Sequence, residues 1–552
     1  MRPESRCVSS STPSCIGAKH EMFDTVITLL DGEHGAEIVR VARVAFFVLL
    51  IVCCVVFVMA SRPTGGSWRA FFLLKLLIVA ALLGVLGYQA GWQIAGFRKP
   101  EFVAFMRRYN QRPDAADRLV KRGAIYDCMG VKLAESVANE PWGRVYPLGA
   151  AAAHVVGYYH PRYGIAGLER AADPQLAGYG ITTRREREQF GRNLLDRKQA
   201  EGLYLALTLD ARLQQKAFDL LDGRRGAVVI LRPRDGAILA LASSPAFDPM
   251  DPAPAEQDAE TAPMLNRALH GRYPPGSTFK VLVAAMAAAQ RKAPVFDCPG
   301  TGFEASPHVL PIRDSAYWAY ERQGRVWPGY GRIGLREGFV RSSNVYFAQL
   351  GLACGAERFN TVAAAAHLNE RVTVFAGADG GLRSFEGNLP SVSQQDRAAV
   401  AQLAMGQGPL LVTPLHVAMF TGAIAADGVL WQPRLDAREE PRRMNRITTP
   451  AAAATVAALM REAVVSGTGR DADIPGLAVC GKTGTAEAAG GDDHAWFTCF
   501  TPQVQARLVV TVIIERGGFG AEAALPVARG LLQEAARIGL LRPEKTEMNT
   551  QH

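Results

Sequence analysis

Three short strings of this chain have residue types and spacings that suit acyl transfer by a serine. They are Ser277-Thr278-Phe279-Lys280, Ser342-Ser343-Asn344 and Lys482-Thr483-Gly484, and each occurs once, in this order. A hydroxyl three residues before an amine can pair a nucleophile with its base. A Ser-x-x-Lys string alone is weak evidence, because composition would give roughly one or two in a chain of this length. The ordered set of three is a strong signal.

The residues around Ser277 predict that its hydroxyl lies at the start of a helix. The preceding Tyr273-Pro274-Pro275-Gly276 cannot be helical, whereas residues 278–286 have the pattern of a buried helix. At a helix N-terminus, unpaired backbone N–H groups and the positive end of the dipole favour an oxyanion. Lys280 lies over the same face three residues further on, so its amine can meet the hydroxyl.

Lys280 can act as a base only if its pKa is lowered. An ordinary lysine has a pKa of about 10.4, and bringing it to roughly 7 to 8 corresponds to about 3 to 4 kcal/mol of differential solvation. Burial, or a second ammonium such as that of Lys482, would have this effect. The simpler alternative is that Ser277 caps the helix and Lys280 is solvated. The apolar run around Lys280 argues against that alternative.

With these motifs in this order, the chain resembles the penicilloyl serine transferases, the superfamily of penicillin-binding proteins and serine β-lactamases. The resemblance implies that Ser277 is the nucleophile, Lys280 the base and Ser342 a proton relay. The substrate-binding residues that it implies are Asn344, Lys482, Thr483, Gly484 and Thr485. The backbone N–H groups of Ser277 and Thr485 would form the oxyanion hole. The implied reaction needs no metal and no cofactor.

Residues beside the motifs narrow the resemblance to the class B penicillin-binding proteins. Similar strings are Asn266-Arg267-Ala268, Gly406-Gln407-Gly408, Val412-Thr413-Pro414-Leu415 and His494-Ala495-Trp496-Phe497. Residues 122–127 and 164–169 resemble the class B pedestal signature. The chain departs from that signature at Cys128-Met129, where a polar pair is expected. The resemblance covers about residues 118–541 of the chain.

Two apolar runs, residues 42–60 and 70–94, are each long enough to cross a hydrocarbon core. A cleaved signal peptide has one shorter run, so we expect a retained transmembrane hairpin over 42–96, after an N-terminal tail over 1–41. An anchor in which only one run spans is the alternative. Large domains translocate despite flanking charge. We therefore expect the catalytic domain on the exterior, periplasmic side of the bacterial cytoplasmic membrane.

The rest of the chain divides into a mixed pedestal, similar to a dimerisation domain, at 97–202, a transpeptidase domain at 203–541 and a flexible tail at 542–552. Strand patterns at both ends of the large domain, with helices between them, predict an α+β fold. The resemblance implies a five-stranded antiparallel sheet with helices, packed against an all-helical subdomain. The expected strands cover 226–231, 237–242, 477–487, 494–500 and 508–514, with helices ending at Leu221 and covering 525–540.

Composition fits a folded protein with a membrane anchor. The 552 residues are 49% hydrophobic and 20% charged, which is enough for one large and one smaller domain. The net charge of +9 suits contact with anionic lipid or wall polymer, but equally a scattered basic surface, and no nucleic-acid motif is present. The nine cysteines lack metal-ligand spacing, and an odd five lie beyond the apolar runs. No disulfide framework is expected.

The leading functional hypothesis is a D,D-transpeptidase that cross-links peptidoglycan stem peptides through an acyl-serine and is blocked by β-lactams. Its substrate would be a lipid-linked precursor, and its expected partner a separate SEDS-type glycosyltransferase. One alternative is a β-lactam-sensing receptor, for which the cytoplasmic segments are small. Another is a D,D-carboxypeptidase or a β-lactamase, for which the sequence identifies no water-activating base. A role in septation, elongation or sporulation stays open.

Three further features have less specific interpretations. Residues 317–320 and 327–330 are rich in tyrosine and tryptophan, so they line the substrate entrance or, as we favour, form a satellite cluster under a long loop. His494 is near Lys482 in the sequence, but we interpret it as structural because Lys280 already supplies a base. Trp496 is interpreted as packing or as a wall of the cleft.

Overall fold

The computed structural model describes residues 120–541, apart from 138–142, 161, 179–199, 254, 256–257, 292–293, 308 and 489–490, and isolated helical residues between 72 and 86. The two predicted tails, and the apolar runs apart from those isolated residues, lie outside the described part. Within the described part, none of the helices has the length and apolar character needed to span a bilayer.

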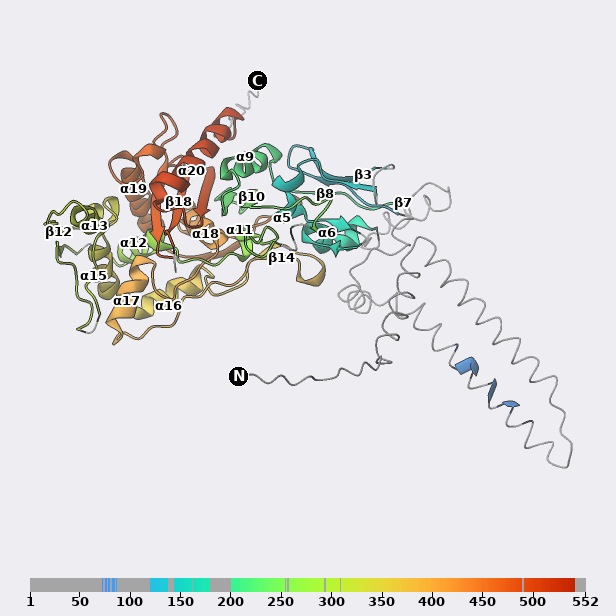
Figure 1. Ribbon diagram of the computed structural model, residues 1–552, viewed down its shortest axis with the longest axis horizontal. Coiled ribbons are helices and arrows are strands. Elements are labelled where there is room, and N and C mark those ends of the chain that lie inside the picture. Colours follow the sequence, from blue (N-terminus) through green and yellow to red (C-terminus); the bar gives the residue numbers. More distant parts are fainter. Residues whose placement is uncertain are drawn as a thin grey trace, which may run out of the picture. The chain divides into compact units, whose positions relative to one another are not determined.

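A five-stranded antiparallel sheet forms the centre of the large domain (Figure 1). Its strand order is β10 (Ile238–Ser244), β9 (Gly226–Leu231), β19 (Leu508–Ile514), β18 (His494–Thr501) and β17 (Cys480–Ala486). Strands from the two ends of the domain therefore pair in one sheet, as the sequence predicted. Strand β17, which carries the Lys-Thr-Gly motif, lies at an edge.

Helices cover both faces of this sheet, which explains why its inner strands are apolar throughout. Helices α9 (Ala211–Leu221) and α20 (Gly520–Arg537) pack on one face, and α18 (Pro414–Ala425) packs on the other. Alternate residues of each strand point to opposite faces. Helix α20 begins five residues before its predicted start at residue 525 and continues through Pro526. The proline removes one helical amide donor, but the carbonyl that this donor would serve belongs to the exposed Glu522.

The second part of the large domain is built around α12 (Lys280–Ala289), which packs on α15 (Asn344–Cys354) and α19 (Pro450–Val465). The other helices used below are α13 (Ser315–Glu321), α14 (Leu335–Val340), α16 (Ala356–Ala365) and α17 (Arg397–Met405).

The expectation of an all-helical subdomain was wrong in one respect. Strands β11 (Phe296–Pro299) and β12 (Gly329–Ile333) form an antiparallel ribbon within it. Gly329 has a φ of 85°, and a Cβ there would lie 2.4 Å from the carbonyl oxygen of Cys298. The ribbon depends on this close backbone approach, which a pattern of apolar residues does not reveal.

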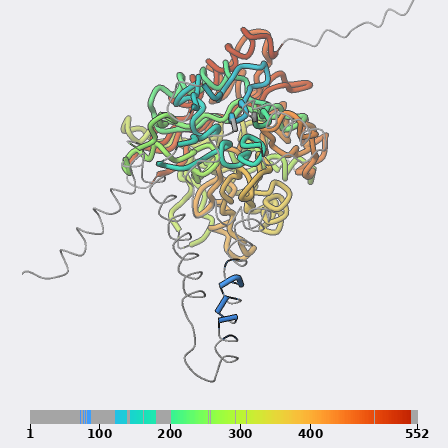
Figure 2. The backbone as a smooth tube through the Cα atoms, turned by 90° about the vertical axis from the view of Figure 1, so that its right-hand side faces the viewer, coloured from blue at the N-terminus to red at the C-terminus, as the bar shows by residue number. Residues whose placement is uncertain are grey.

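The pedestal contains a four-stranded sheet in the order β4 (Arg144–Val145), β3 (Lys132–Ser136), β2 (Ile125–Tyr126) and β8 (Leu205–Ala206). Strand β8, which follows the predicted boundary at 202, pairs in parallel with β2. The tube in Figure 2 shows the cyan pedestal next to the green start of the large domain. The proposed domain boundaries stay predictions.

Buried charges hold the pedestal together. Glu169 is fully buried in helix α6 (Gly167–Ala171) and accepts hydrogen bonds from Arg122 Nε at 2.6 Å and Arg144 Nε at 2.7 Å. Burial by itself would raise the pKa of Glu169, but the two guanidinium groups outweigh it and hold this pKa below its usual range. Residues 122–127 and 164–169 are the two segments that resemble the class B pedestal signature. Arg122, the first residue of one segment, and Glu169, the last residue of the other, meet in this ion pair.

Candidate active site

Ser277 lies in a short 3-10 turn, Gly276–Thr278, that leads directly into α12. Gly276 has a φ of 53°, and a Cβ at this position would lie 2.4 Å from the carbonyl oxygen of Thr485. Glycine is therefore required for two reasons, the left-handed backbone and the approach of strand β17. The Gly276 N–H donates to the carbonyl of Gly406 at 2.9 Å, which fixes the turn beside the end of α17.

The residues before the turn are held by the sheet. The indole of Trp496, on β18, is fully buried and donates to the carbonyl of Pro274 at 3.0 Å. The Tyr273 hydroxyl donates to Glu515 Oε1 at 2.7 Å, and Arg267 Nε donates to the same oxygen at 2.8 Å. Trp496 thus packs behind the nucleophile rather than lining the cleft. His494 stacks edge-on against Tyr273 at 5.3 Å, in keeping with a structural role.

Lys280 is the first residue of α12, and its side chain is fully buried. Its Nζ donates to the carbonyl of Ser342 at 2.8 Å and to Asn344 Oδ1 at 2.7 Å, and it lies 3.4 Å from Ser342 Oγ. Burial lowers the pKa of Lys280 to about 7, although the nearby Asp314 carboxylate acts in the opposite direction. The solvated alternative is excluded for this side chain, and the cause of the lowered pKa is burial.

The second motif places a hydroxyl between two amines. Ser342 has a φ of 58°, so it is held in the left-handed region just before α15 begins. Its Oγ lies 2.9 Å from Lys482 Nζ, in addition to the 3.4 Å contact with Lys280. Ser343 caps α15 by accepting a hydrogen bond from the Tyr346 N–H at 3.0 Å. Asn344 donates through Nδ2 to the carbonyl of Arg313 at 3.1 Å.

The third motif brings the edge strand β17 against the other two. Lys482 is fully buried, and both this burial and the positive charge of Lys280 hold its pKa well below its usual range. A Cβ at Gly484 would lie 2.8 Å from Thr278 Cγ2, so only glycine lets the strand approach the nucleophile turn. The hydroxyls of Thr483 and Thr468 lie 2.6 Å apart.

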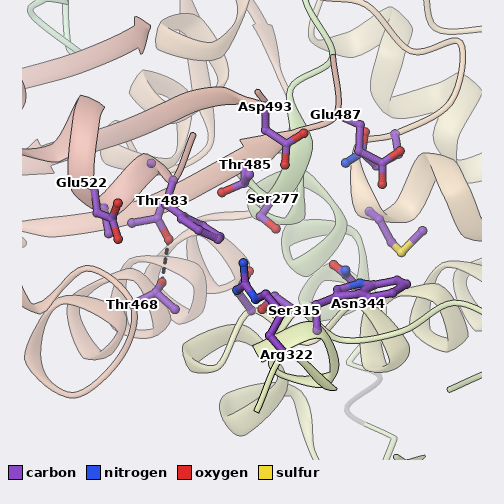
Figure 3. A pocket seen from close by; sticks show the side chains of 17 residues that line it. Ser277, Ser315, Arg322, Asn344, Thr468, Thr483, Thr485, Glu487, Asp493 and Glu522 are labelled. Atoms are coloured by element: carbon purple, nitrogen blue, oxygen red, sulfur yellow. Dashed lines mark hydrogen bonds between the residues drawn. The ribbon is translucent and has the colours of Figure 1, made fainter. Parts of the chain in front are cut away.

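A cleft of about 640 Å³ opens above these groups (Figure 3). Of the residues predicted from the sequence, those that line it are Ser277, Ser342, Asn344, Thr483 and Thr485. Lys280 and Lys482 lie buried beneath, and Gly484 serves the close packing of the strand. The tertiary structure thus brings all eight predicted site residues together. In the described residues the Lys280 amine bonds to Ser342 and Asn344, and no hydrogen bond joins it to Ser277.

The site also includes residues outside the three motifs that the sequence did not predict. Asp314 is 3% exposed; its Oδ1 accepts from the Val345 N–H at 3.2 Å, and its Oδ2 has no partner in the described part of the chain. A single aspartate in a long connection carries no sequence signal for this role. The residues outside the motifs that line the cleft include Ser315, Trp318, Arg322, Thr468, Glu487, Asp493 and Glu522. Of these, only Trp318, in the aromatic segment, was singled out from the sequence.

The fold and the site together define a serine acyl transferase. Its parts are an antiparallel sheet whose edge strand bears Lys482, a helix that begins with Lys280 just after Ser277, and Ser342 between the two amines. The chain belongs to the penicillin-binding protein family, and within it to class B. Residues 226–533, more than half of the chain, match the penicillin binding protein transpeptidase domain. Residues 122–199 match the penicillin binding protein A dimerisation domain.

Two mycobacterial proteins with similar sequences share one name. The chain is 32% identical to peptidoglycan D,D-transpeptidase PbpA of Mycolicibacterium smegmatis, over 78% of this chain and 92% of the relative. It is 33% identical to the protein of the same name in Mycobacterium tuberculosis, over 77% and 91% of the two chains.

Solved structures agree with these sequence matches. The imipenem acyl-enzyme complex of penicillin-binding protein A from M. tuberculosis superimposes with a TM-score of 0.68 at 30% identity. The match covers 76% of this chain and 99% of that chain. Pseudomonas aeruginosa PBP2, in complex with WCK 5153, matches with a TM-score of 0.63 at 27% identity, over 77% and 98% of the two chains.

Proposed function

We propose that this protein is a penicillin-sensitive peptidoglycan D,D-transpeptidase and that its eight motif residues perform the chemistry. The observation that carries the proposal is the pair of buried amines, those of Lys280 and Lys482, on either side of Ser342 beneath a cleft lined by Ser277. A lysine with a pKa of about 7 is neutral often enough near neutral pH to act as a base. Relatives named D,D-transpeptidase and a structure of an acyl-enzyme support the same assignment.

Acylation follows from this arrangement. Ser277 Oγ attacks the carbonyl carbon of the penultimate D-alanine, and the hydroxyl proton passes to the neutral amine of Lys280. The C–N bond to the terminal D-alanine breaks, and its nitrogen takes up a proton that Lys280 returns through Ser342. The short hydrogen-bonded path from Lys280 through Ser342 to Lys482 suits this relay. An amine of a second stem peptide then attacks the ester carbonyl. The new amide bond forms as the ester bond to Ser277 Oγ breaks, and a proton from that amine passes through Lys280 to Ser277 Oγ.

The remaining motif residues bind the substrate. The backbone N–H groups of Ser277 and Thr485 act as the oxyanion hole. The hydroxyls of Thr483 and Thr485 line the cleft, and with the amine of Lys482 beneath them they bind the terminal carboxylate. Asn344 orients the peptide backbone. Its side-chain amide already bridges Lys280 and the Arg313 carbonyl, so its position is fixed before substrate arrives.

We also propose a membrane location for the protein. The apolar runs at 42–60 and 70–94 would anchor it as a hairpin, with the pedestal and the transpeptidase domain on the exterior side of the cytoplasmic membrane. The pedestal and transpeptidase matches account for 122–199 and 226–533. A separate membrane glycosyltransferase, of the SEDS type, would then supply the sugar polymer. Co-purification from membranes without such a partner would count against this part of the proposal.

Intact-mass analysis with benzylpenicillin tests the proposed chemistry. The wild-type protein is expected to gain one stable adduct, and Ser277→Ala is expected to gain none, because the acyl bond forms on Ser277 Oγ. A persistent adduct on Ser277→Ala would place the nucleophile elsewhere. Rapid consumption of the drug without an adduct would indicate a β-lactamase. Release of D-alanine from lipid-linked substrate with formation of cross-linked product then separates a transpeptidase from a carboxypeptidase or a sensor.

A further inference from the structure

Helix α13 presents one face to the cleft although none of its residues is buried in the core. Ser315, Trp318 and Arg322, the last at the C-cap, stand three and four residues apart, which is the spacing of one helix face. All three line the cleft that contains Ser277. Trp318 is 51% exposed. A helix with no buried residue whose cleft face carries a half-exposed tryptophan contributes little to the core through that face.

The other residues of this segment hold α13 in place without using the cleft face. The guanidinium of Arg313 lies 4.1 Å from the ring centre of Tyr317. On the side away from the cleft residues, Tyr320 packs on Trp327 at 4.8 Å, and Trp327 packs on Tyr330 at 5.0 Å. Both interpretations of the aromatic segments therefore apply, because Trp318 lines the cleft and the other rings form the satellite cluster.

Arg322 is exposed, and in the described residues its guanidinium makes neither an ion pair nor a hydrogen bond. A free guanidinium in a binding cleft matches a carboxylate, which it can bind through two parallel hydrogen bonds. Figure 3 shows Arg322 on the side of the cleft opposite Glu487 and Asp493. These two side chains and Glu522, which also lines the cleft, would repel a substrate carboxylate, whereas Arg322 is a cationic lining residue that attracts it.

We propose that Arg322 and Trp318 recognise the donor stem peptide through a side chain that ends in a carboxylate, as in a residue derived from a diamino dicarboxylic acid. Arg322 binds the carboxylate, and Trp318 covers the aliphatic part of the side chain. The donor is favoured over the acceptor because α13 starts beside Asn344, whose amide donates to the Arg313 carbonyl at 3.1 Å. This inference rests on the proposed function, in which Asn344 holds the donor backbone.

Three matched stem peptides ending in a D-alanyl thioester test this specificity. They differ only in the third residue, which carries a free side-chain carboxylate, the corresponding carboxamide, or the side chain of lysine. For wild-type protein we expect a kcat/KM for thiol release about tenfold higher with the carboxylate than with the carboxamide, because a hydrogen-bonded charge pair is lost. Arg322→Gln is expected to bring this ratio close to one, mainly through KM. Trp318→Ala should lower both values together.

Arg325→Gln is the matched control, because Arg325 stacks on Tyr320 at 4.6 Å in the same segment but does not line the cleft. It should keep the wild-type ratio, and a benzylpenicillin adduct on each variant shows that it is folded. A wild-type ratio within twofold of one, or a ratio that Arg322→Gln leaves intact, would overturn the inference. So would failure of the carboxylate peptide to acylate a protein that benzylpenicillin labels. If benzylpenicillin does not label Ser277 at all, the proposed function itself fails.

Discussion

At the scale of single residues, the site is a set of buried amines whose charge the fold makes unfavourable. Lys280 loses its hydration on entering α12, and burial is the main cause of its lowered pKa. Asp314 limits this shift. Its carboxylate is buried and near enough to favour the charged amine, although it belongs to none of the three motifs. The reactivity of Ser277 therefore depends on the pKa of Lys280, which desolvation lowers and the Asp314 carboxylate raises.

This balance predicts the pH dependence of acylation. The neutral fraction of Lys280 rises as pH increases through about 7, so the second-order rate constant for benzylpenicillin should rise with pH and level off above that value. Asp314→Asn removes the negative charge that favours the ammonium, so the pKa of Lys280 falls and the midpoint should move to lower pH. Stopped-flow acylation from pH 5 to about 9 measures both midpoints. A flat wild-type profile, or a shift of the variant to higher pH, would contradict the role assigned to Lys280.

At the scale of elements, the geometry depends on close backbone contact between strand β17 and the nucleophile turn. Gly276 and Gly484 permit this contact from the two sides, since a Cβ at either position would overlap the opposite element. Thr485, whose N–H is assigned to the oxyanion hole, has its carbonyl at the point where Gly276 approaches. The distance between the two proposed oxyanion donors is thus set by residues that have no side chain.

Gly276→Ala tests this dependence. The new Cβ would lie 2.4 Å from the Thr485 carbonyl oxygen, so β17 must move away and the benzylpenicillin acylation rate should fall by about a hundredfold or more. Gly223→Ala is the matched control, because Gly223 also has a positive φ, at 70°, but open space where its Cβ would be. The control should lose some stability through backbone strain and keep its acylation rate. Equal rate losses in both variants would show that the contact with β17 is unimportant.

At the scale of the whole molecule, the pedestal and the large domain share structure. Strand β8 of the large-domain segment completes the pedestal sheet, and Asp127 Oδ2 accepts a hydrogen bond at 3.0 Å from the Ala211 N–H, at the start of α9. The side chain of Gln214, also on α9, donates to the Ala151 carbonyl at 2.7 Å. These bonds tie the pedestal to a helix that packs on the central sheet.

The buried ion pairs of the pedestal should matter for stability but not for chemistry. Glu169→Gln leaves Arg144 without a carboxylate and Arg122 with that of Asp173 alone, and we expect a loss of about 3 to 5 kcal/mol, measured by thermal unfolding. Glu135→Gln breaks the exposed pair with Lys132 and should cost less than about 1 kcal/mol. Both variants should still form the benzylpenicillin adduct. Similar unfolding temperatures for the two variants would contradict the importance of the buried network.

The same network predicts a pH effect of defined sign. The folded-state pKa of Glu169 lies below its ordinary value of 4.5, so its contribution is complete above about pH 4.5 and is lost as pH falls through the folded-state pKa. The stability difference between wild type and Glu169→Gln should accordingly shrink on acidification.

Much of the fold and the motif residues could be predicted from the sequence, because they depend on local patterns. Short, continuous apolar runs marked the strands of the central sheet, and a run such as Val281 to Met286 marked the buried helix α12. The β11–β12 ribbon and the early start of α20 were not predicted. The ribbon depends on a close backbone contact at a glycine, and α20 continues through a proline. The ordered strings identified Ser277, Lys280, Ser342 and Lys482.

Which residues can react, and in which elements they lie, followed from the order of amino acids, because residue type and hydrophobic pattern act over a few positions. How the site works depends on the fold. Burial of Lys280 near Asp314, the approach of β17 to Gly276, and the position of Trp318 and Arg322 at the cleft depend on contacts between residues far apart in the chain. Desolvation and packing are properties of the folded environment of a side chain, and no short stretch of sequence contains that environment.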